Sequence, residues 1–188
     1  METELFNKVR DFIKENAKSE SQMRHFDRTV HWVKELRPDA DEAILIAAIG
    51  HDAERIFRDE ADDFVNNSKR FTDEEFLYAH GEKGADIIGE FLEKQGADPK
   101  LIERVKHLIS RHEVGGDDGQ NLLKDADSLS FVENNTQIFL KKLDKLGYDR
   151  VKEKMDWMYN RITDPKAKEV ATPFYEKMIK DLNNAAGR

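Results

Sequence analysis

Apolar residues recur at intervals of three and four along almost the whole chain. The run of Leu5, Phe6, Val9, Phe12 and Ile13 illustrates the pattern. This spacing puts apolar side chains on one face of an α-helix, whereas the two-residue alternation that marks β-strands is not sustained anywhere in the sequence. The pattern therefore predicts an all-α fold, a bundle of about eight helices.

The size and composition of the chain fit one domain. Its 188 residues can bury a core, and no linker or internal repeat divides them. Hydrophobic residues make up 38% and charged residues 37% of the chain, so we expect a compact core beneath a heavily charged surface. A single domain over 1–188 is predicted.

Composition also argues against several classes of function. The formal net charge of -8 repels polyphosphate backbones, so a nucleic-acid polymer is not expected as a partner. The longest apolar stretch, Ala43 to Ile49, is too short to cross a bilayer, and the N-terminus lacks the apolar core of a signal peptide. A cytoplasmic protein with no membrane partner is expected. Because the chain has no cysteine, any metal site must use imidazole and carboxylate groups.

A central helix is predicted to begin near Asp41. Its residues from Ala43 to Ile49 are apolar on every side, which indicates a helix at the centre of the domain. His51-Asp52 follow Gly50 and end this helix. Burying such a pair costs several kcal/mol unless the carboxylate is paired, hydrogen-bonded or bound to a metal. The alternative is a helix that emerges into solvent at Gly50, which would leave the pair without a function.

Local signals predict the ends of other helices. A helix over 22–36 should stop before Pro38, because the residue preceding proline avoids helical angles. Thr72 and Glu75 form a capping box that would start the helix carrying His80. The other expected features are an end at Gly96, a start at Asp98-Pro99 of the helix leading to His112, loops at 59–71 and 115–120, and helices at 136–146, 149–162 and 173–183.

Three further positions, His25, His112 and Asp127, decide whether His51-Asp52 belong to a larger site. His25 lies on the apolar face of its helix and should point into the core, whereas His31 should lie at the surface. His112 continues the apolar face of the helix before it, whereas His107 projects to the flank. Asp127 lies one turn before Phe131 and can also reach the interior. Imidazole and carboxylate ligands suit Mn, Fe, Co, Ni or Zn.

The ordered series His25, His51-Asp52 and Asp127 resembles the ligand set that defines the HD superfamily of metal-dependent phosphohydrolases. Residues 25–28 resemble the family's first-histidine helix, 47–52 its central helix and 125–129 its closing aspartate motif. The resemblance implies an HD-type helical bundle with a metal-site core at about 22–132 and C-terminal helices over 136–184 packed on it. It also implies that Asp127 is a metal ligand and Asp125 a supporting residue.

Two more segments resemble the extra histidines of binuclear HD proteins, which include cyclic dinucleotide phosphodiesterases and di-iron oxygenases. They are His80 with Gly84-Ala85, and Arg111-His112-Glu113. The implied two-metal ligand set is His25, His51, Asp52, His80, His112 and Asp127, with Asp52 as a bridge. The phosphodiesterases carry adjacent histidines and a Gly-Tyr-Pro segment that this chain lacks, so cyclic dinucleotide hydrolysis is not favoured.

The residues alone leave the number of ions open. One divalent transition metal is expected, but His80 and His112 could be core histidines whose ring nitrogens are satisfied by backbone carbonyls. In that case the site would hold no second ion.

The resemblance implies hydrolysis of a small phosphorylated substrate, such as a nucleotide, by metal-activated water. Asp52 would hold the water as well as the metal, assisted by Glu54 or Asp125. Arg55 and Lys83 are the preferred cations for the phosphoryl group, ahead of Arg58 and Arg111, although a charge on a surface like this one is commonly only solvated.

Two other functions stay open from the sequence. One is a di-iron oxygenase, which would use the six ligands to bind oxygen and an organic substrate. The other is a non-catalytic, metal-stabilised binding domain, in which the amphipathic helices after Thr136 form a homo-oligomer interface.

Overall fold

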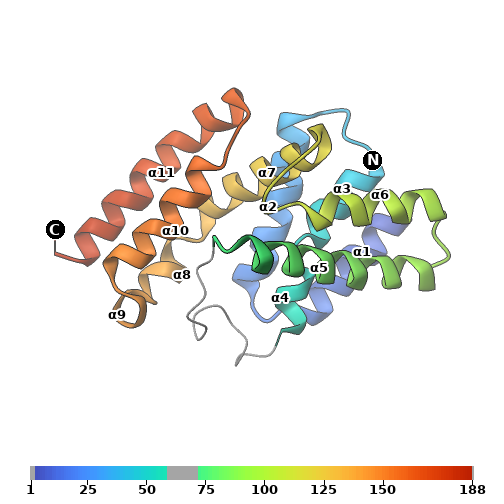
Figure 1. The fold of residues 1–188 in the computed structure, drawn as a ribbon, viewed down its shortest axis with the longest axis horizontal. Coiled ribbons are helices and arrows are strands. Elements are labelled where there is room, and N and C mark those ends of the chain that lie inside the picture. The colour runs from blue at the N-terminus through green and yellow to red at the C-terminus, as the bar shows by residue number, and fades with distance from the viewer. Residues whose placement is uncertain (1–2, 59–71, 188) are drawn as a thin grey trace.

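The computed structural model describes residues 3–58 and 72–187, which form an all-α fold (Figure 1). Within them lie eleven helices and no strand. They are α1 (Glu4–Asn16), α2 (Glu20–Leu36), α3 (Glu42–Gly50), α4 (Ala53–Phe57), α5 (Glu74–Lys94), α6 (Pro99–Ser110), α7 (Asp118–Asn134), α8 (Thr136–Leu140), α9 (Leu143–Leu146), α10 (Tyr148–Asn160) and α11 (Pro165–Ala185). Because α4, α8 and α9 have only 5, 5 and 4 residues, the expected bundle of about eight helices agrees with the number of longer ones. No described helix is both long and apolar enough to cross a membrane.

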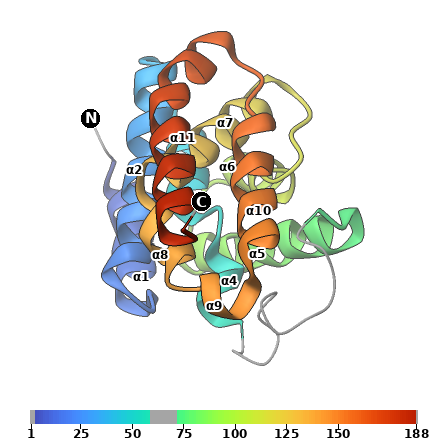
Figure 2. The same ribbon diagram turned by 90° about the vertical axis from the view of Figure 1, so that its left-hand side faces the viewer.

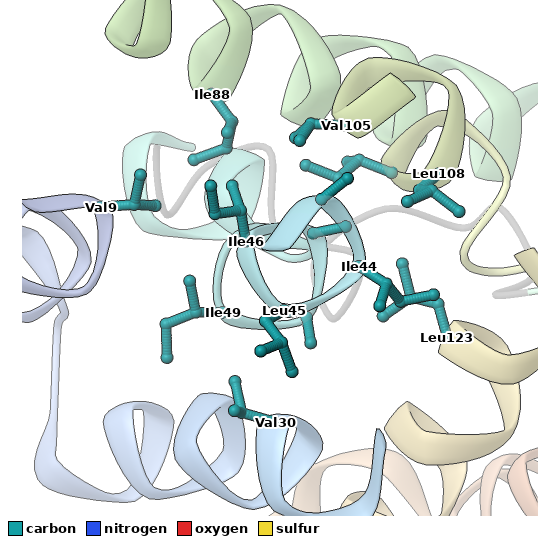
Figure 3. Packing of buried hydrophobic residues seen from close by; sticks show 14 of the residues in the cluster. Val9, Val30, Ile44, Leu45, Ile46, Ile49, Ile88, Val105, Leu108 and Leu123 are labelled. Atoms are coloured by element: carbon teal, nitrogen blue, oxygen red, sulfur yellow. The ribbon is translucent and has the colours of Figure 1, made fainter. Parts of the chain in front are cut away.

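Helix α3 lies at the centre of the larger of two core clusters. Every residue from Ala43 to Gly50 is buried. Figure 3 shows side chains from other helices around it, among them Val9 of α1, Val30 of α2 and Ile88 of α5. The prediction of a central helix that ends before His51 is therefore confirmed. Because other helices surround α3, its C-terminal end lies inside the molecule and not in solvent. His51, which follows that end, is fully buried.

The second core cluster joins α7 to the C-terminal helices. Leu129 and Val132 of α7 are buried in the same cluster as Met155 of α10 and Met178 of α11. Helices α10 and α11 lie side by side on one flank of the molecule in both views (Figures 1 and 2). Helix α7 thus contributes to both clusters, and its residues from Leu122 to Val132 are all buried.

Two predicted helix starts are wrong by a few residues. Helix α5 is capped by Asp73, whose carboxylate accepts a hydrogen bond from the Phe76 amide, and not by Thr72. Helix α7 begins inside the expected loop at 115–120, because Asp117 and Gln120 form a reciprocal capping box there. In both places a neighbouring aspartate supplies the cap. The other expected loop, 59–71, lies outside the described residues.

The C-terminal helices also differ from expectation. The segment 136–146 forms two short helices instead of one, and α11 starts at Pro165 instead of Pro173. Asp164 caps α11, and Pro173 lies within it. A proline inside a helix removes one backbone hydrogen bond, whereas proline in the first turn removes none. The buried residues of α11, Ala167, Ala171, Met178 and Leu182, lie on both sides of Pro173, so the helix packs against the core along its length.

Close packing of α5 on α6 sets the spacing between the segments that carry His80 and His112. A Cβ atom at Gly81 would lie 2.3 Å from the Ser110 carbonyl oxygen, which is backbone and cannot move away cheaply. Gly81→Ala is therefore expected to lower the free energy of unfolding by about 1–3 kcal/mol.

Chemical denaturation measures this effect, and Gly89→Ala on the same helix is the matched control. The new methyl group at position 89 meets only the flexible side chain of Lys106, so its effect should stay within about 1 kcal/mol. Equal stability of the two variants would contradict the close α5–α6 contact.

Candidate metal centre

Four buried histidines lie in a row at the meeting point of α2, α3, α5 and α6. His25, His51, His80 and His112 are between 0% and 7% exposed. Successive ring centroids, from His25 to His51, then His112, then His80, are each 5.2 Å apart. The prediction that these four side chains face the interior is confirmed, and His107 is exposed, as expected.

The Nδ1 atoms of His51 and His112 are held by the backbone. Nδ1 of His51 lies 2.9 Å from the Ala48 carbonyl oxygen, and Nδ1 of His112 lies 2.8 Å from that of Ile109. Because a carbonyl only accepts hydrogen bonds, Nδ1 carries the proton in both rings. In the neutral imidazole, Nε2 then has a free lone pair.

His25 and His80 are held in the same way by side chains. Ser130 Oγ donates its proton to the His25 carbonyl oxygen at 2.8 Å, so Ser130 Oγ accepts a hydrogen bond from His25 Nδ1, also at 2.8 Å. Nδ1 of His80 lies 2.7 Å from Glu54 Oε2. All four imidazoles are thus anchored through Nδ1, and each presents Nε2 as a ligand atom.

These Nε2 atoms face carboxylates. Asp127 Oδ1 lies 3.1 Å from Nε2 of His25 and 3.4 Å from Nε2 of His51. Asp52 Oδ1 lies 2.9 Å from Nε2 of His80 and 3.5 Å from Nε2 of His112. A carboxylate oxygen and an unprotonated Nε2 are both acceptors, so their approach is favourable only with a proton or a cation between them.

Two of these nitrogens provide a direct test of whether a metal fits. His51 Nε2 and His112 Nε2 are buried and have no hydrogen-bond partner among the described residues. Their contacts with Asp127 and Asp52 are close enough for charge interaction but lack hydrogen-bond geometry. A buried polar atom without a partner costs about 1–3 kcal/mol, and a metal ion beside either nitrogen would satisfy that nitrogen.

The donors form two groups that share one residue. His25, His51 and Asp52 offer ligand atoms within 4.8 Å of one another, and so do Asp52, His80, His112 and Glu113. The buried His, Asp and Glu side chains can therefore hold a metal ion. Asp52 belongs to both groups, and its role as a bridge between two ions stays a prediction. Such donors suit Mn, Fe, Co, Ni or Zn.

Glu113 is a candidate ligand that the sequence reasoning did not assign. It is 4% exposed and directly follows His112. Its position next to a predicted ligand was the available signal, but neither periodicity nor the HD resemblance distinguished it from a surface glutamate.

Two arginines bind the carboxylates of this metal centre. Arg55 donates from Nε to Asp52 Oδ1 and from Nη2 to Glu113 Oε1, both at 2.8 Å. Arg161 makes short ion pairs with Glu113 and Asp127 and donates to Ser128 Oγ at 2.7 Å. Arg55 was predicted here. Arg161 was not, because it follows α10, in the region 136–184 expected only to pack against the site.

Lys83 lies outside this centre, contrary to the prediction. The buried face of α5 includes His80, Gly81 and Gly84, whereas Lys83 is exposed. The residue one turn after His80 on its own face is Gly84, because four residues rotate a helix by slightly more than one turn and three by less. Lys83 therefore lies on the flank of the helix.

The two suggested supporting carboxylates have different roles. Glu54 holds His80 and pairs with Arg58. Burial raises the pKa of its carboxyl, but His80 and Arg58 outweigh burial and lower the pKa to about 2. Asp125 does not contact the histidines. It accepts hydrogen bonds from the amides of Thr163 and Asp164, and so positions the turn that follows Arg161.

Electrostatics keep the carboxylates ionised. Burial alone raises the pKa values of Asp52 and Asp127, but Arg55 beside the first and Arg161 beside the second hold both well below the usual range. Burial lowers the pKa of His112. For His51, burial acts in the same direction, but the charge of Asp127 outweighs it and raises the pKa from 6.5 to about 8.

The raised pKa of His51 predicts that the stability of the metal-free protein and its metal affinity depend on pH in opposite directions. Its protonated form stabilises the metal-free protein by about 2 kcal/mol at pH values below 6.5, and this contribution is lost as the pH rises through about 8. Metal binding needs the unprotonated Nε2, so metal affinity should fall about tenfold for each pH unit below 8.

Denaturation of the metal-free protein and metal titration, each over this pH range, test both slopes. His107→Gln, which removes an exposed histidine, should change neither. A metal affinity independent of pH would contradict ligation by His51.

The part of the chain that matches a known protein family includes the whole metal centre. Residues 8–178 match the family described as Domain of unknown function (DUF4202). This range contains all the candidate ligands and both arginines. No curated protein and no solved structure matches the chain. Since the match covers most of its length, the chain belongs to the DUF4202 family.

Proposed function

We propose that this protein is an HD-type, metal-dependent phosphohydrolase that acts on a small phosphorylated substrate, such as a nucleotide. The observation that carries the proposal is the convergence of four anchored imidazoles on carboxylates that are themselves bound by arginines. Supporting it, the residues brought together include the series His25, His51-Asp52 and Asp127, in the order that suggested the HD resemblance. His80, His112 and Glu113 would supply the donors for a second ion.

The chemistry needs a nucleophile and stabilisation of negative charge. A divalent metal held by these ligands would lower the pKa of a coordinated water from 15.7 toward about 7 and withdraw charge from a phosphoryl oxygen. Arg55, with a side chain 31% exposed, pairs with Asp52 and Glu113 and can bind a phosphoryl oxygen. Asp52 can accept a hydrogen bond from the attacking water and so orient it. Glu54 keeps the His80 ring in place.

Arg55→Met is expected to lower kcat/KM for phosphate release about 10²–10³-fold, because it removes a cation from the developing charge. The matched control is Lys83→Met, which removes a cation that lies outside the centre and should change kcat/KM less than about 2-fold. Steady-state kinetics, with the metal content measured in parallel, compare the two variants. Equal losses in the two variants would contradict the assigned position of the substrate.

A di-iron oxygenase is the second candidate, and the shared position of Asp52 favours it, because such a carboxylate can bridge two irons. The two arginines favour the hydrolase, since they match an anionic substrate.

Metal analysis of freshly purified protein, coupled to a phosphate-release screen over nucleotides and sugar phosphates, tests the proposal. One or two equivalents of metal and phosphate release from at least one substrate are expected. Two equivalents of iron with oxygen-dependent turnover and no phosphate would indicate the oxygenase. Bound metal without any turnover would indicate a binding domain, and absence of metal would remove the basis of all three.

A further inference from the structure

Arg161, at the C-terminal end of α10, binds the metal centre through all three of its nitrogen atoms. Nε donates to Ser128 Oγ at 2.7 Å, and Nη2 donates to Asp127 Oδ2. Nη1 donates to two oxygens of Glu113, the backbone carbonyl at 3.1 Å and Oε2 of the side chain. The guanidinium carbon lies 4.5 Å from the ring centroid of Trp157, and the side chain is only 7% exposed. These contacts fix both the plane and the direction of the guanidinium.

Asp127 is held by Arg161 through one oxygen and faces imidazoles with the other. Oδ2 accepts from Arg161, whereas Oδ1 lies 3.1 Å from Nε2 of His25 and 3.4 Å from Nε2 of His51. If this carboxylate turned, it would break a buried ion pair, which is strongly unfavourable. Arg161 therefore keeps Oδ1 beside these two imidazoles.

Glu113 shows the same division between its two oxygens. Oε2 accepts from Arg161, whereas Oε1 lies 3.9 Å from Nε2 of His80 and 3.9 Å from Nε2 of His112. Because Arg161 also binds the carbonyl oxygen of Glu113, it fixes the main chain at this position as well as the carboxylate. A single guanidinium thus orients two carboxylates, one beside each pair of imidazoles.

Arg55 binds different oxygens from those that Arg161 binds. It donates to Oδ1 of Asp52, the oxygen that lies 2.9 Å from His80 Nε2, and to Oε1 of Glu113. At Glu113, where both arginines bind, Arg55 takes the oxygen that faces the imidazoles and Arg161 takes the other one. The two arginines therefore have different roles, and that of Arg161 is to orient the carboxylates.

We propose that Arg161 is a positioning residue of the metal centre: it holds one oxygen of Asp127 and one of Glu113, so that each carboxylate binds metal through its other oxygen alone. A lysine has the same charge but lacks the planar fork, so it cannot hold two carboxylates and a hydroxyl in fixed directions. The C-terminal helices thus take part in metal binding although they supply none of the candidate ligands. The inference goes beyond the proposed function, because it applies to the metal centre whichever reaction occurs there.

Titration of the metal-free protein with Co²⁺, followed by visible absorption, tests this role in Arg161→Lys. The Co²⁺ affinity should fall about 10–100-fold, the usual loss when a residue that orients a metal ligand is replaced. The absorption per bound Co²⁺ should also fall, because a released carboxylate can bind through both oxygens and raise the coordination number. A loss of stability alone would not change the spectrum of the bound ion. Wild-type affinity, or a wild-type spectrum, in Arg161→Lys would overturn the proposal.

Arg28→Lys is the matched control. Arg28 also pairs with a glutamate, Glu133, at 2.8 Å, and its guanidinium carbon lies 5.1 Å from the ring centroid of Trp32. Since Glu133 is not a candidate ligand, the Co²⁺ affinity and spectrum of this variant should equal those of the wild-type protein. Equal losses in Arg28→Lys and Arg161→Lys would be a general effect of replacing an arginine and would overturn the assigned role.

The wild-type protein provides a test that needs no variant. In crystals with Co²⁺ bound, Asp127 should contact the ion through one oxygen while its other oxygen remains on Arg161. Contact through both oxygens, or separation of Arg161 from Asp127, would overturn the proposal.

These results separate the inference from the proposed function. Co²⁺ binding that depends on Arg161, with no phosphorylated compound hydrolysed, would support the positioning role and remove the hydrolase. Phosphate release together with a Co²⁺ affinity that is the same in Arg161→Lys would do the opposite. Failure of the wild-type protein to bind Co²⁺ would overturn both.

Discussion

Asp52→Asn is expected to remove metal from both ligand groups and to lower phosphate release by about 10³-fold or more. Asp52 is the one residue that both groups contain, so no other substitution should affect both equally. Asparagine has nearly the same shape but no charge, and its amide cannot replace a carboxylate between two sets of imidazoles. Arg55 also loses one of its two carboxylate partners.

Metal stoichiometry, measured together with phosphate release, checks this prediction. Asp125→Asn is the matched control, because Asp125 is also buried in the same region but binds the backbone of Thr163 and Asp164. It should lower the free energy of unfolding by about 1–3 kcal/mol and leave the metal content unchanged. Full metal occupancy in Asp52→Asn would show that the two groups do not share this ligand.

Removal of metal by a chelator is expected to lower the Tm by about 5–10 °C. A ligand present at 100 times its dissociation constant stabilises the folded protein by about 2.7 kcal/mol. For a domain of this size each kcal/mol corresponds to about 2–4 °C. Above about pH 8, where His51 is neutral, the Nε2 atoms of His51 and His112 give the physical reason, since the metal-free protein leaves both buried with no hydrogen-bond partner among the described residues.

Thermal unfolding with metal and with chelator measures the shift. His51→Gln removes one of these two nitrogens and a candidate ligand. The difference in Tm between metal and chelator should therefore be much smaller for this variant. A chelator shift of the same size in this variant would mean that the stabilising ion binds elsewhere. No shift in the wild-type protein would mean that no ion stabilises the fold.

The central part of this protein was predictable because its signals are local. The segment from Ala43 to Ile49 is apolar on every side, and such a helix is stable in water only when other elements cover all of its faces. Side chains from other helices surround α3 (Figure 3). Helical periodicity likewise predicted which histidines face inward. For His25 and His112 that direction follows from the apolar residues one turn away, whatever the rest of the chain does.

The start of α11 was missed although its signal is local. Asp164-Pro165 has the same N-cap aspartate and first-turn proline that predicted the start of α6 at Asp98-Pro99, and Asp164 caps α11. The local sequence does not show that this helix continues through Pro173, because proline disfavours a helix interior. The buried face of α11 extends to both sides of Pro173 in the second core cluster, which is a property of the packed molecule.

By itself, the sequence determined the all-α class, the central helix and the inward direction of the histidines, because each depends on residues within one or two helical turns. Only the tertiary structure decided which charges meet them. Glu113 and Arg161 join the centre, and Lys83 does not, although no spacing along the chain separates them from solvated surface charges. The place of Arg161 depends on how α10 packs against α7, and such long-range packing leaves no periodic trace in a charged residue's neighbours.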